Sequence, residues 1–250
     1  MGVNLLILGG TTEATALGAA VAAAGIAGTV SFAGRVARPK RQALPQRVGG
    51  FGGVEGLRDY LAAHDVTHVV DATHPFAAQM SSNAVAACAA ESVPLIALTR
   101  APWIEQAGDD WTHVPDIASA VAALDRPAAR IMLAVGRMHL DEFAPNPQHF
   151  YLLRLVDPPS SPPPFSDHYV LVSRGPFTSD DDRALMQEHA IDLVVSKNAG
   201  GIGAYAKIEA ARALHLPVIM IDRPAIPERA ESYSVTEVMA WLSHDADRGV

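Results

Sequence analysis

Short apolar runs alternate with alanine-rich stretches along this chain, beginning with Leu5-Leu6-Ile7-Leu8. Such alternation is typical of a parallel sheet that helices cover on both faces. In the first half we predict strands near residues 4–8, 28–32, 46–49, 68–71 and 94–98, and helices near 12–24, 54–63 and 76–91. In the second half we predict a helix near 116–124 and strands near 130–135, 149–155, 168–173, 191–196 and 217–221. The expected fold class is therefore α/β, with mostly parallel sheets flanked by helices.

The stretch from Arg100 to His113 interrupts this alternation and is typical of a connection between domains. We predict an N-terminal domain over residues 1–100, a linker over 101–113 and a C-terminal domain over 114–234. An amphipathic stretch near 235–243 predicts a helix within residues 235–250 that packs back on one of the domains. A chain of 250 residues with 49% hydrophobic content is large enough for two cores.

The first apolar run ends in a turn, Gly9-Gly10-Thr11-Thr12-Glu13, that leads into an alanine-rich stretch. Backbone N–H groups at such a turn, and the positive end of the helix, suit a pyrophosphate. The same pattern also occurs in domains that bind no nucleotide, and Ala14 replaces the third glycine of the full dinucleotide motif. Further on, Gly34-Arg35 stands where NAD-binding domains carry an acid for the ribose hydroxyls. Arg35 favours the 2'-phosphate of NADP, unless it is only a solvated surface residue.

Arginine supplies sixteen of the nineteen positive charges, since only Lys40, Lys197 and Lys207 are lysines, while the net charge is -8. The net charge argues against a nucleic-acid partner, and guanidinium groups suit a small polyanion, although a GC-rich genome gives the same bias. Cys88, the only cysteine, predicts a buried structural thiol and excludes an internal disulfide. We find no secretory signal and no spanning segment, and we expect a cytoplasmic protein without a membrane partner.

Polar residues follow many of the predicted strands at their carboxyl ends, where open parallel sheets bind ligands. They are Asp71-Ala72-Thr73-His74, Arg100, Gly136-Arg137, Arg154, Ser173-Arg174, Lys197-Asn198-Ala199-Gly200-Gly201 and Asp222-Arg223. Their recurrence predicts an electropositive cleft, whereas each arginine alone is equally well explained as a cap or an ion-pair partner. The lysine, amide and two glycines of residues 197–201 suit close approach of the backbone to an anion, and an ordinary glycine turn is the alternative.

His74 is a candidate hydrogen-bond donor or acid, because an ordinary histidine titrates near neutral pH, and a purely structural histidine is the alternative. The chain contains no H-E-x-x-H, no G-x-S-x-G and no Tyr-x-x-x-Lys motif. These absences leave a metal hydrolase, a serine hydrolase and a short-chain dehydrogenase without support. We predict no metal site.

Several motifs together match one known family. They are Ile7-Leu8-Gly9-Gly10-Thr11-Thr12-Glu13-Ala14, Gly34-Arg35-Val36, Val48-Gly49-Gly50-Phe51-Gly52-Gly53, Asp71-Ala72-Thr73-His74-Pro75-Phe76-Ala77, Gly136-Arg137, Arg174-Gly175-Pro176-Phe177 and Lys197-Asn198-Ala199-Gly200-Gly201. In their order and spacing, from Leu5 to about Pro224, the chain resembles the precorrin-6A reductases of cobalamin biosynthesis. Ala199 departs from the family pattern, in which we expect serine in many relatives.

The resemblance implies two Rossmann-like domains with NADPH in the cleft between them, and reduction of a ring double bond of precorrin-6A to give precorrin-6B, the dihydro product. The cofactor contacts that we predict are Gly9, Gly10, Thr11, Thr12, Glu13, Gly34, Arg35, Thr73, His74, Lys197, Asn198, Gly200 and Gly201. The acetate and propionate groups of the tetrapyrrole suit an arginine-lined edge. The substrate contacts that we predict are Arg100, Arg137, Arg154, Ser173 and Arg174. His74 is the catalytic candidate, and water is the alternative donor of the added proton.

Two further classes of protein stay open at this point. A non-catalytic NADP-binding sensor would bind the dinucleotide and leave precorrin-6A unchanged. A two-domain sugar-nucleotide transferase would prefer a sugar nucleotide to NADPH. The oligomeric state, with a monomer as one option, and the presence of cobalt in the substrate are also left open.

Overall fold

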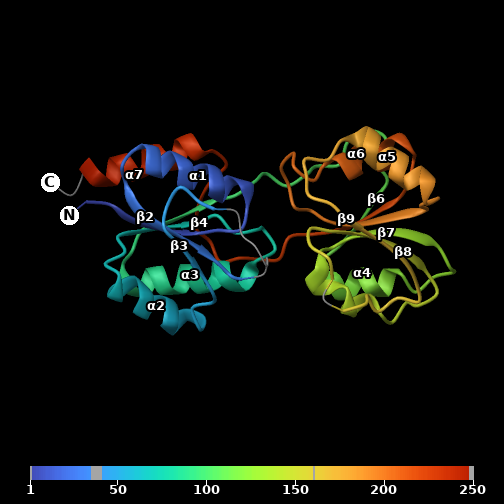
Figure 1. Ribbon diagram of the computed structural model, residues 1–250, viewed down its shortest axis with the longest axis horizontal. Helices are drawn as coiled ribbons and strands as arrows, with labels where there is room; N and C mark the ends of the chain where they lie inside the picture. Colours follow the sequence, from blue (N-terminus) through green and yellow to red (C-terminus); the bar gives the residue numbers. More distant parts are fainter. Residues whose placement is uncertain (1, 35–40, 160, 248–250) are drawn as a thin grey trace. The chain divides into compact units, whose positions relative to one another are not determined.

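Every strand in the described part of the chain lies in one of two parallel sheets of six strands each (Figure 1). The structure is a computed structural model that describes residues 2–34, 41–159 and 161–247. The chain divides into two units, and the first consists of Met1–Arg100 together with Ala225–Val250. The second unit is the continuous segment Ala101–Pro224. The predicted α/β fold with parallel sheets flanked by helices is confirmed.

The first unit has the strand order β12-β5-β4-β1-β2-β3. Its strands are β1 (Asn4–Leu8), β2 (Ala27–Phe32), β3 (Gln46–Val48), β4 (His68–Asp71), β5 (Leu95–Leu98) and β12 (Ala230–Ser232). Its helices are α1 (Thr12–Ala23), α2 (Gly53–Ala63), α3 (Ala78–Glu91) and α7 (Val235–Asp247). All neighbouring strands in this sheet are parallel, so their carboxyl ends share one edge.

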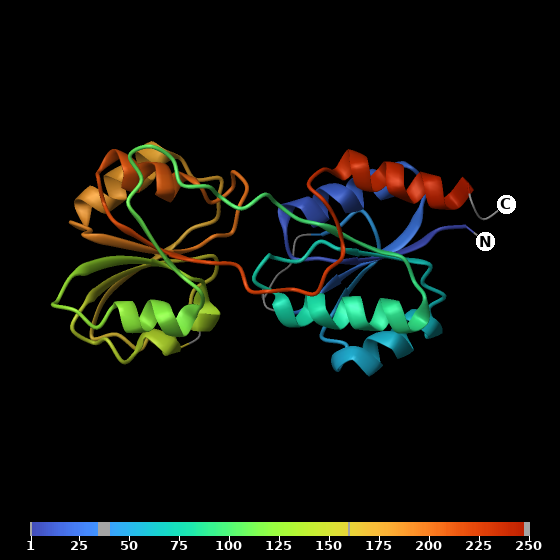
Figure 2. The same cartoon turned by 180° about the vertical axis from the view of Figure 1, so that it is seen from behind.

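The apolar run of β1 supplies a core to both faces of the first sheet, because successive side chains of a strand point to opposite faces. Leu5 and Ile7 pack in one cluster with residues of α1 and with Val238 and Leu242 of α7. Leu6 and Leu8 pack in another cluster with residues of α2 and α3. The turned view shows the same layers, with α1 and α7 on one side of the sheet and α2 and α3 on the other (Figure 2).

The second unit has the strand order β6-β11-β10-β7-β8-β9. Its strands are β6 (Trp111–Val114), β7 (Arg130–Ala134), β8 (Phe150–Leu155), β9 (Asp167–Val172), β10 (Leu193–Lys197) and β11 (Val218–Ile221). Its helices are α4 (Ile117–Ala123), α5 (Ser179–Glu188) and α6 (Ala206–Ala213), with 3₁₀ turns at Arg137–His139 and Asp141–Phe143. Figure 1 shows α5 and α6 on one face of this sheet and α4 on the other. No helix among the described residues has the length and hydropathy needed to cross a bilayer.

Two segments differ from the predicted domain limits. Residues 101–113, expected as a linker, belong to the second unit, because Trp103 and Trp111 are each only 9% exposed and pack in its core. Residues 225–234, expected in the C-terminal domain, belong to the first unit, where β12 pairs with β5. The C-terminal helix α7 packs on this first unit against α1.

Candidate functional site

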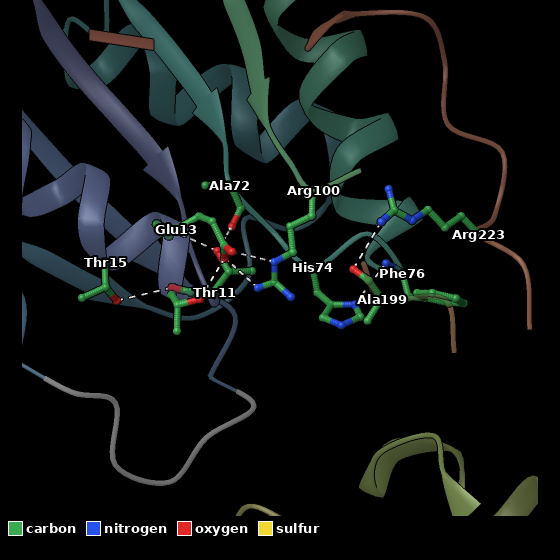
Figure 3. Close-up of polar contacts among 11 residues, drawn as sticks. Thr11, Glu13, Thr15, Ala72, His74, Phe76, Arg100, Ala199 and Arg223 are labelled. Carbon is green, nitrogen blue, oxygen red and sulfur yellow. Dashed lines mark hydrogen bonds and ion pairs between the residues drawn. The ribbon is translucent and has the colours of Figure 1, made fainter. Parts of the chain in front are cut away.

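The glycine turn between β1 and α1 lies at the carboxyl edge of the first sheet. Gly10 has a φ of +131°, a conformation that favours glycine, and a Cβ atom built there would meet no heavy atom within 4 Å. Thr11 caps α1, since its hydroxyl accepts a hydrogen bond from the N–H of Ala14 at 3.1 Å. The same hydroxyl donates to the carbonyl of Ala72 at 2.8 Å, just beyond β4 (Figure 3). The turn is therefore open on one side and fixed to the neighbouring strand on the other.

Glu13 and Arg100 form a two-pronged ion pair next to this turn (Figure 3). Arg100 donates from Nε to Oε1 at 2.8 Å and from Nη2 to Oε2 at 2.6 Å. Burial alone raises the pKa of the Glu13 carboxyl, but the hydrogen bonds from Arg100 and from the backbone outweigh it and hold the pKa below its usual range. The predicted cofactor contact Glu13 and the predicted substrate contact Arg100 thus bind each other within the first unit.

A buried carboxylate organises the loop after β4. Asp71 accepts from the N–H and the hydroxyl of Thr73 at 3.1 and 2.7 Å, and from the hydroxyl of Ser81 at 2.6 Å. Its other buried partner is the guanidinium of Arg229, which precedes β12. Thr73, a predicted cofactor contact, is therefore held in place by Asp71 rather than being a freely rotating side chain.

His74 lies on the same loop (Figure 3), and it is exposed. The N–H of Phe76 donates to Nδ1 of His74 at 3.2 Å. A ring nitrogen that accepts a hydrogen bond carries no proton, so the neutral ring of His74 has its proton on Nε2. The loop thus fixes which nitrogen of His74 can donate.

The edge near β2 and β3 contains a residue that sequence reasoning missed. Arg47 donates to the hydroxyl of Ser31 at 2.7 Å and to the carbonyls of Gly49 and Gly50 at 3.0 and 3.1 Å. Its guanidinium also lies 4.0 Å from the centre of the Phe51 ring. Arg47 therefore holds the glycine-rich segment after β3 against the end of β2. The available signal was an arginine two residues before the first of two glycine pairs, Gly49-Gly50 and Gly52-Gly53.

Gly34, one of the predicted contacts, ends the described stretch after β2 with a φ of +79°. Arg35, the residue on which the predicted NADP preference depends, lies outside the described residues. The end of β2 and the residues up to Gly34, Phe32-Ala33-Gly34, contain no acid that could take the ribose hydroxyls of NAD.

The segment from Lys197 to Gly201 lies at the carboxyl end of β10 in the second unit. The Asn198 side chain is buried and bonds Trp103 in both directions, accepting from its N–H at 2.8 Å and donating to its carbonyl at 3.0 Å. A Cβ on Gly200 would come within 2.2 Å of Arg223 and 2.3 Å of the Ala101 carbonyl, so only glycine fits there. The side chain of Asn198, one of the predicted cofactor contacts, is therefore occupied by hydrogen bonds within the protein.

The predicted substrate contacts of the second unit fall into two groups. Arg154 is buried against Asp182, and its guanidinium stacks on Phe177 at 4.2 Å. Arg137 and Arg174 are exposed beyond β7 and β9, and Arg174 also pairs with Asp157. Ser173 follows β9, where its N–H donates to the Leu155 carbonyl at 2.9 Å.

Cys88 is buried in α3, and burial, with a smaller effect of Asp71, raises the pKa of its thiol to about 12. The predicted structural thiol is therefore confirmed, and it is no nucleophile near neutral pH.

A family model described as "Precorrin-6x reductase CbiJ/CobK" matches residues 4–243. This chain belongs to that family. The precorrin-6A reductase of Rhodobacter capsulatus is 57% identical over 246 residues, which cover 98% of this chain and 97% of that protein. The precorrin-6A reductase of Rhodococcus erythropolis is 44% identical over 242 residues, which cover 96% of this chain and 97% of that protein. A solved structure described as "CobK precorrin-6A reductase" matches with a TM-score of 0.92 and 57% identity, covering 97% of this chain and 96% of that one. The predicted family is confirmed, and with it a reductase of cobalamin biosynthesis.

Proposed function

We propose that this member of the precorrin-6x reductase family reduces a ring double bond of precorrin-6A with NADPH and releases precorrin-6B. The observation that carries the proposal is the near full-length 57% identity to the Rhodobacter capsulatus precorrin-6A reductase. The substrate we propose is free of cobalt, because the two relatives described above carry names without the metal.

The donor groups at the carboxyl edge of the first sheet fit a dinucleotide. Gly10 leaves its side of the turn open, and the first turn of α1 directs backbone N–H groups and the positive helix end toward that side. The carboxylate of Glu13 would repel a pyrophosphate, but Arg100 neutralises it. We therefore assign the pyrophosphate to residues 9–13 and the neighbouring ribose to Thr73 and His74.

We assign the 2'-phosphate to Gly34 and Arg35. The absence of an acid from Phe32 to Gly34 removes the usual selection for NAD, and a guanidinium at residue 35 matches a phosphate in charge and geometry.

When bound, NADPH supplies a hydride to the macrocycle, and the protein contributes orientation, exclusion of water and a proton. The proton is needed at the carbon next to the one that receives the hydride. We propose the imidazolium form of His74 as its source, because this ring is exposed at the carboxyl edge of the first sheet and its loss of a proton leaves a stable neutral imidazole; water is the other candidate.

The exposed cations of the second sheet edge suit the carboxylates of the macrocycle. We assign these carboxylates to Arg137, Ser173 and Arg174, while Lys197, Gly200 and Gly201 present a cation and backbone N–H groups nearby on the same edge. Arg154 and Arg100 are each held by a carboxylate of the protein with side chains only 10% and 16% exposed, so we assign them to holding the edges in shape. Arg174 also pairs with a carboxylate, but its side chain is 46% exposed and remains accessible to a ligand.

The decisive experiment is turnover by the purified chain with precorrin-6A and with its cobalt-containing form, each with NADPH and with NADH. We expect the absorption spectrum of cobalt-free precorrin-6A to change with NADPH as NADP+ appears. In the same assay Arg35→Ala should raise the KM for NADPH at least tenfold and scarcely alter that for NADH, because only the 2'-phosphate loses a partner.

A bound NADPH with an unchanged macrocycle spectrum would identify a sensor instead of a reductase. Equal losses for NADPH and NADH in Arg35→Ala would remove the proposed phosphate contact.

A further inference from the structure

Four carbonyl groups of the loop that follows β10, residues 198–204, accept hydrogen bonds from side chains outside the loop. Arg223 donates to the carbonyls of Asn198 at 3.0 Å and Ala199 at 3.2 Å. Trp103 Nε1 donates to the Gly201 carbonyl at 2.7 Å. Lys207 Nζ donates to the Ala204 carbonyl at 2.6 Å. These four carbonyls are thus held by a guanidinium, a lysine amino group and an indole.

The N–H groups of the same loop are left for other acceptors. Within the described chain, those of Gly200, Gly201, Ile202 and Gly203 donate to no protein acceptor. Gly200 and Gly201 both have left-handed φ values, +69° and +67°. Turns that contain left-handed residues align successive N–H groups into concavities that bind anions. Each planar peptide unit joins a carbonyl to the next N–H, so the bonds to the Ala199 and Gly201 carbonyls fix the N–H groups of Gly200 and Ile202 without a ligand, as a preorganised site requires.

Trp103 contacts this loop at two separate positions. Its backbone bonds the Asn198 amide in both directions, at 2.8 and 3.0 Å, and its indole reaches Gly201. Its ring lies under the Lys207 ammonium at 4.8 Å and beside the Tyr205 ring at 5.4 Å. The residue is only 9% exposed, so it acts on the loop from inside the second unit.

We propose that Trp103 is a positioning residue: through Asn198 and Gly201 it fixes the loop so that its N–H groups bind an anionic oxygen of the ligand. That oxygen belongs either to a phosphate of the cofactor or to a carboxylate of the macrocycle. The inference rests on the proposed function for the identity of these ligands. Trp103 itself touches neither of them.

The test compares Trp103→Phe with Trp111→Phe. Both tryptophans are 9% exposed and pack in the same core, so the change in volume is matched. Trp111 Nε1 has no hydrogen-bond partner in the described chain, so phenylalanine there removes no bond. In Trp103→Phe we expect the KM for one of the two ligands to rise about three- to tenfold with kcat within about twofold, the effect of one hydrogen bond. Trp111→Phe should leave both constants within about twofold of wild type.

The ligand whose KM rises identifies the source of the anionic oxygen. Equal constants in the two variants, with an active wild type, would overturn the inference. If the wild type shows no turnover, only the proposed function is contradicted. The role of Trp103 is then tested by equilibrium binding of NADPH and of precorrin-6A to both variants. Thermal unfolding checks that the two variants fold alike, and Lys207→Met, which removes the donor to Ala204, should reproduce the selective rise if Trp103→Phe does not fold.

Discussion

Lys207 is a lysine whose ammonium group is buried in the second unit. Burial, with a smaller contribution from the Arg154 guanidinium, lowers its pKa to about 7, although the carboxylate of Asp182 acts in the opposite direction. Its partners in the interior are the carbonyl of Ala204 and the ring of Trp103. The charged form of Lys207 therefore lowers the free energy of unfolding relative to the neutral form.

This cost predicts an unusual pH dependence of stability. The pKa is lower in the folded than in the unfolded state, so the unfolded state binds more protons between pH 7 and the ordinary lysine value. Stability should therefore rise with pH above about 7, by up to about 1.4 kcal/mol per pH unit from this group. We expect the difference in unfolding free energy between wild type and Lys207→Met to shift in favour of wild type from about pH 7 to about pH 9, a range that lies between the folded pKa of about 7 and the ordinary lysine value of 10.5. Denaturant titrations at several pH values measure it, and a constant difference would contradict the lowered pKa.

At the residue scale, the sequence predicted which charged residues stand at strand ends but not which residues they pair with. Arg100 and Arg154 stand at strand ends, as expected, yet their partners Glu13 and Asp182 lie far away in sequence. The partner of a guanidinium group depends on the folded structure. A single sequence therefore does not distinguish an arginine that binds a ligand from one that forms an ion pair within the protein. Arg229 was missed for the same reason, because its ion-pair partner Asp71 lies 158 residues away in the sequence.

Among the elements, β12 is attached to its sheet by more than backbone hydrogen bonds. Arg229, just before the strand, forms a buried ion pair with Asp71 at the end of β4, with side chains only 7% and 1% exposed. This pair holds the incoming segment to the loop that carries Thr73 and His74. The attachment of β12 is thus coupled to the candidate site.

Breaking this pair should be costly, because the carboxylate would stay buried without its counter-charge. We expect Arg229→Met to lower the unfolding free energy by about 3–5 kcal/mol. Arg58→Met is the control, since Arg58 pairs with Glu55 and Glu91 but its side chain is 38% exposed, and we expect it to change stability little. Chemical denaturation compares them. A similar, small loss in both variants would show that the Asp71 pair is no stronger than a surface pair.

Most of the predicted strands contain consecutive buried apolar residues. In β1, β4 and β10 these are residues 5–8, 69–70 and 193–195, and the limits of the three strands lie within a residue or two of the prediction. β12 is only three residues long, Ala-Glu-Ser, and sits at a sheet edge where no alternation of apolar residues is required. β6 was hidden because its apolar ends, Trp111 and Val114, fall in a stretch rich in charged and turn residues. Helices α5 and α6 were not among the predicted elements.

For the molecule as a whole, the first unit is assembled from two separate parts of the chain. Val238 and Leu242 of α7 are fully buried in the same cluster as Leu5 and Ile7 of β1. Two domains were expected, but a discontinuous unit was not, because periodicity is a local property and does not reveal which sheet a returning strand joins.

This arrangement predicts that a chain ending at Pro224 loses the first unit but keeps the second. Removal of residues 225–250 strips β12 from the edge of β5 and α7 from α1, which exposes apolar surface. Hydrogen exchange followed by mass spectrometry should show unprotected amides in β1 and β4, with β7 and β10 still protected. Full protection of β1 in the truncated chain would contradict this account.

The division of the chain also has a consequence for biosynthesis. During translation, all residues of the second unit, Ala101–Pro224, leave the ribosome before Ala225. The first unit is completed only when β12 and α7 have also been synthesised. We therefore expect nascent chains to acquire structure in the middle first and at the beginning last. Before β12 pairs with β5, the edge of β5 carries unpaired backbone groups, so we expect the unfinished polypeptide to be prone to pairing with strands of other chains.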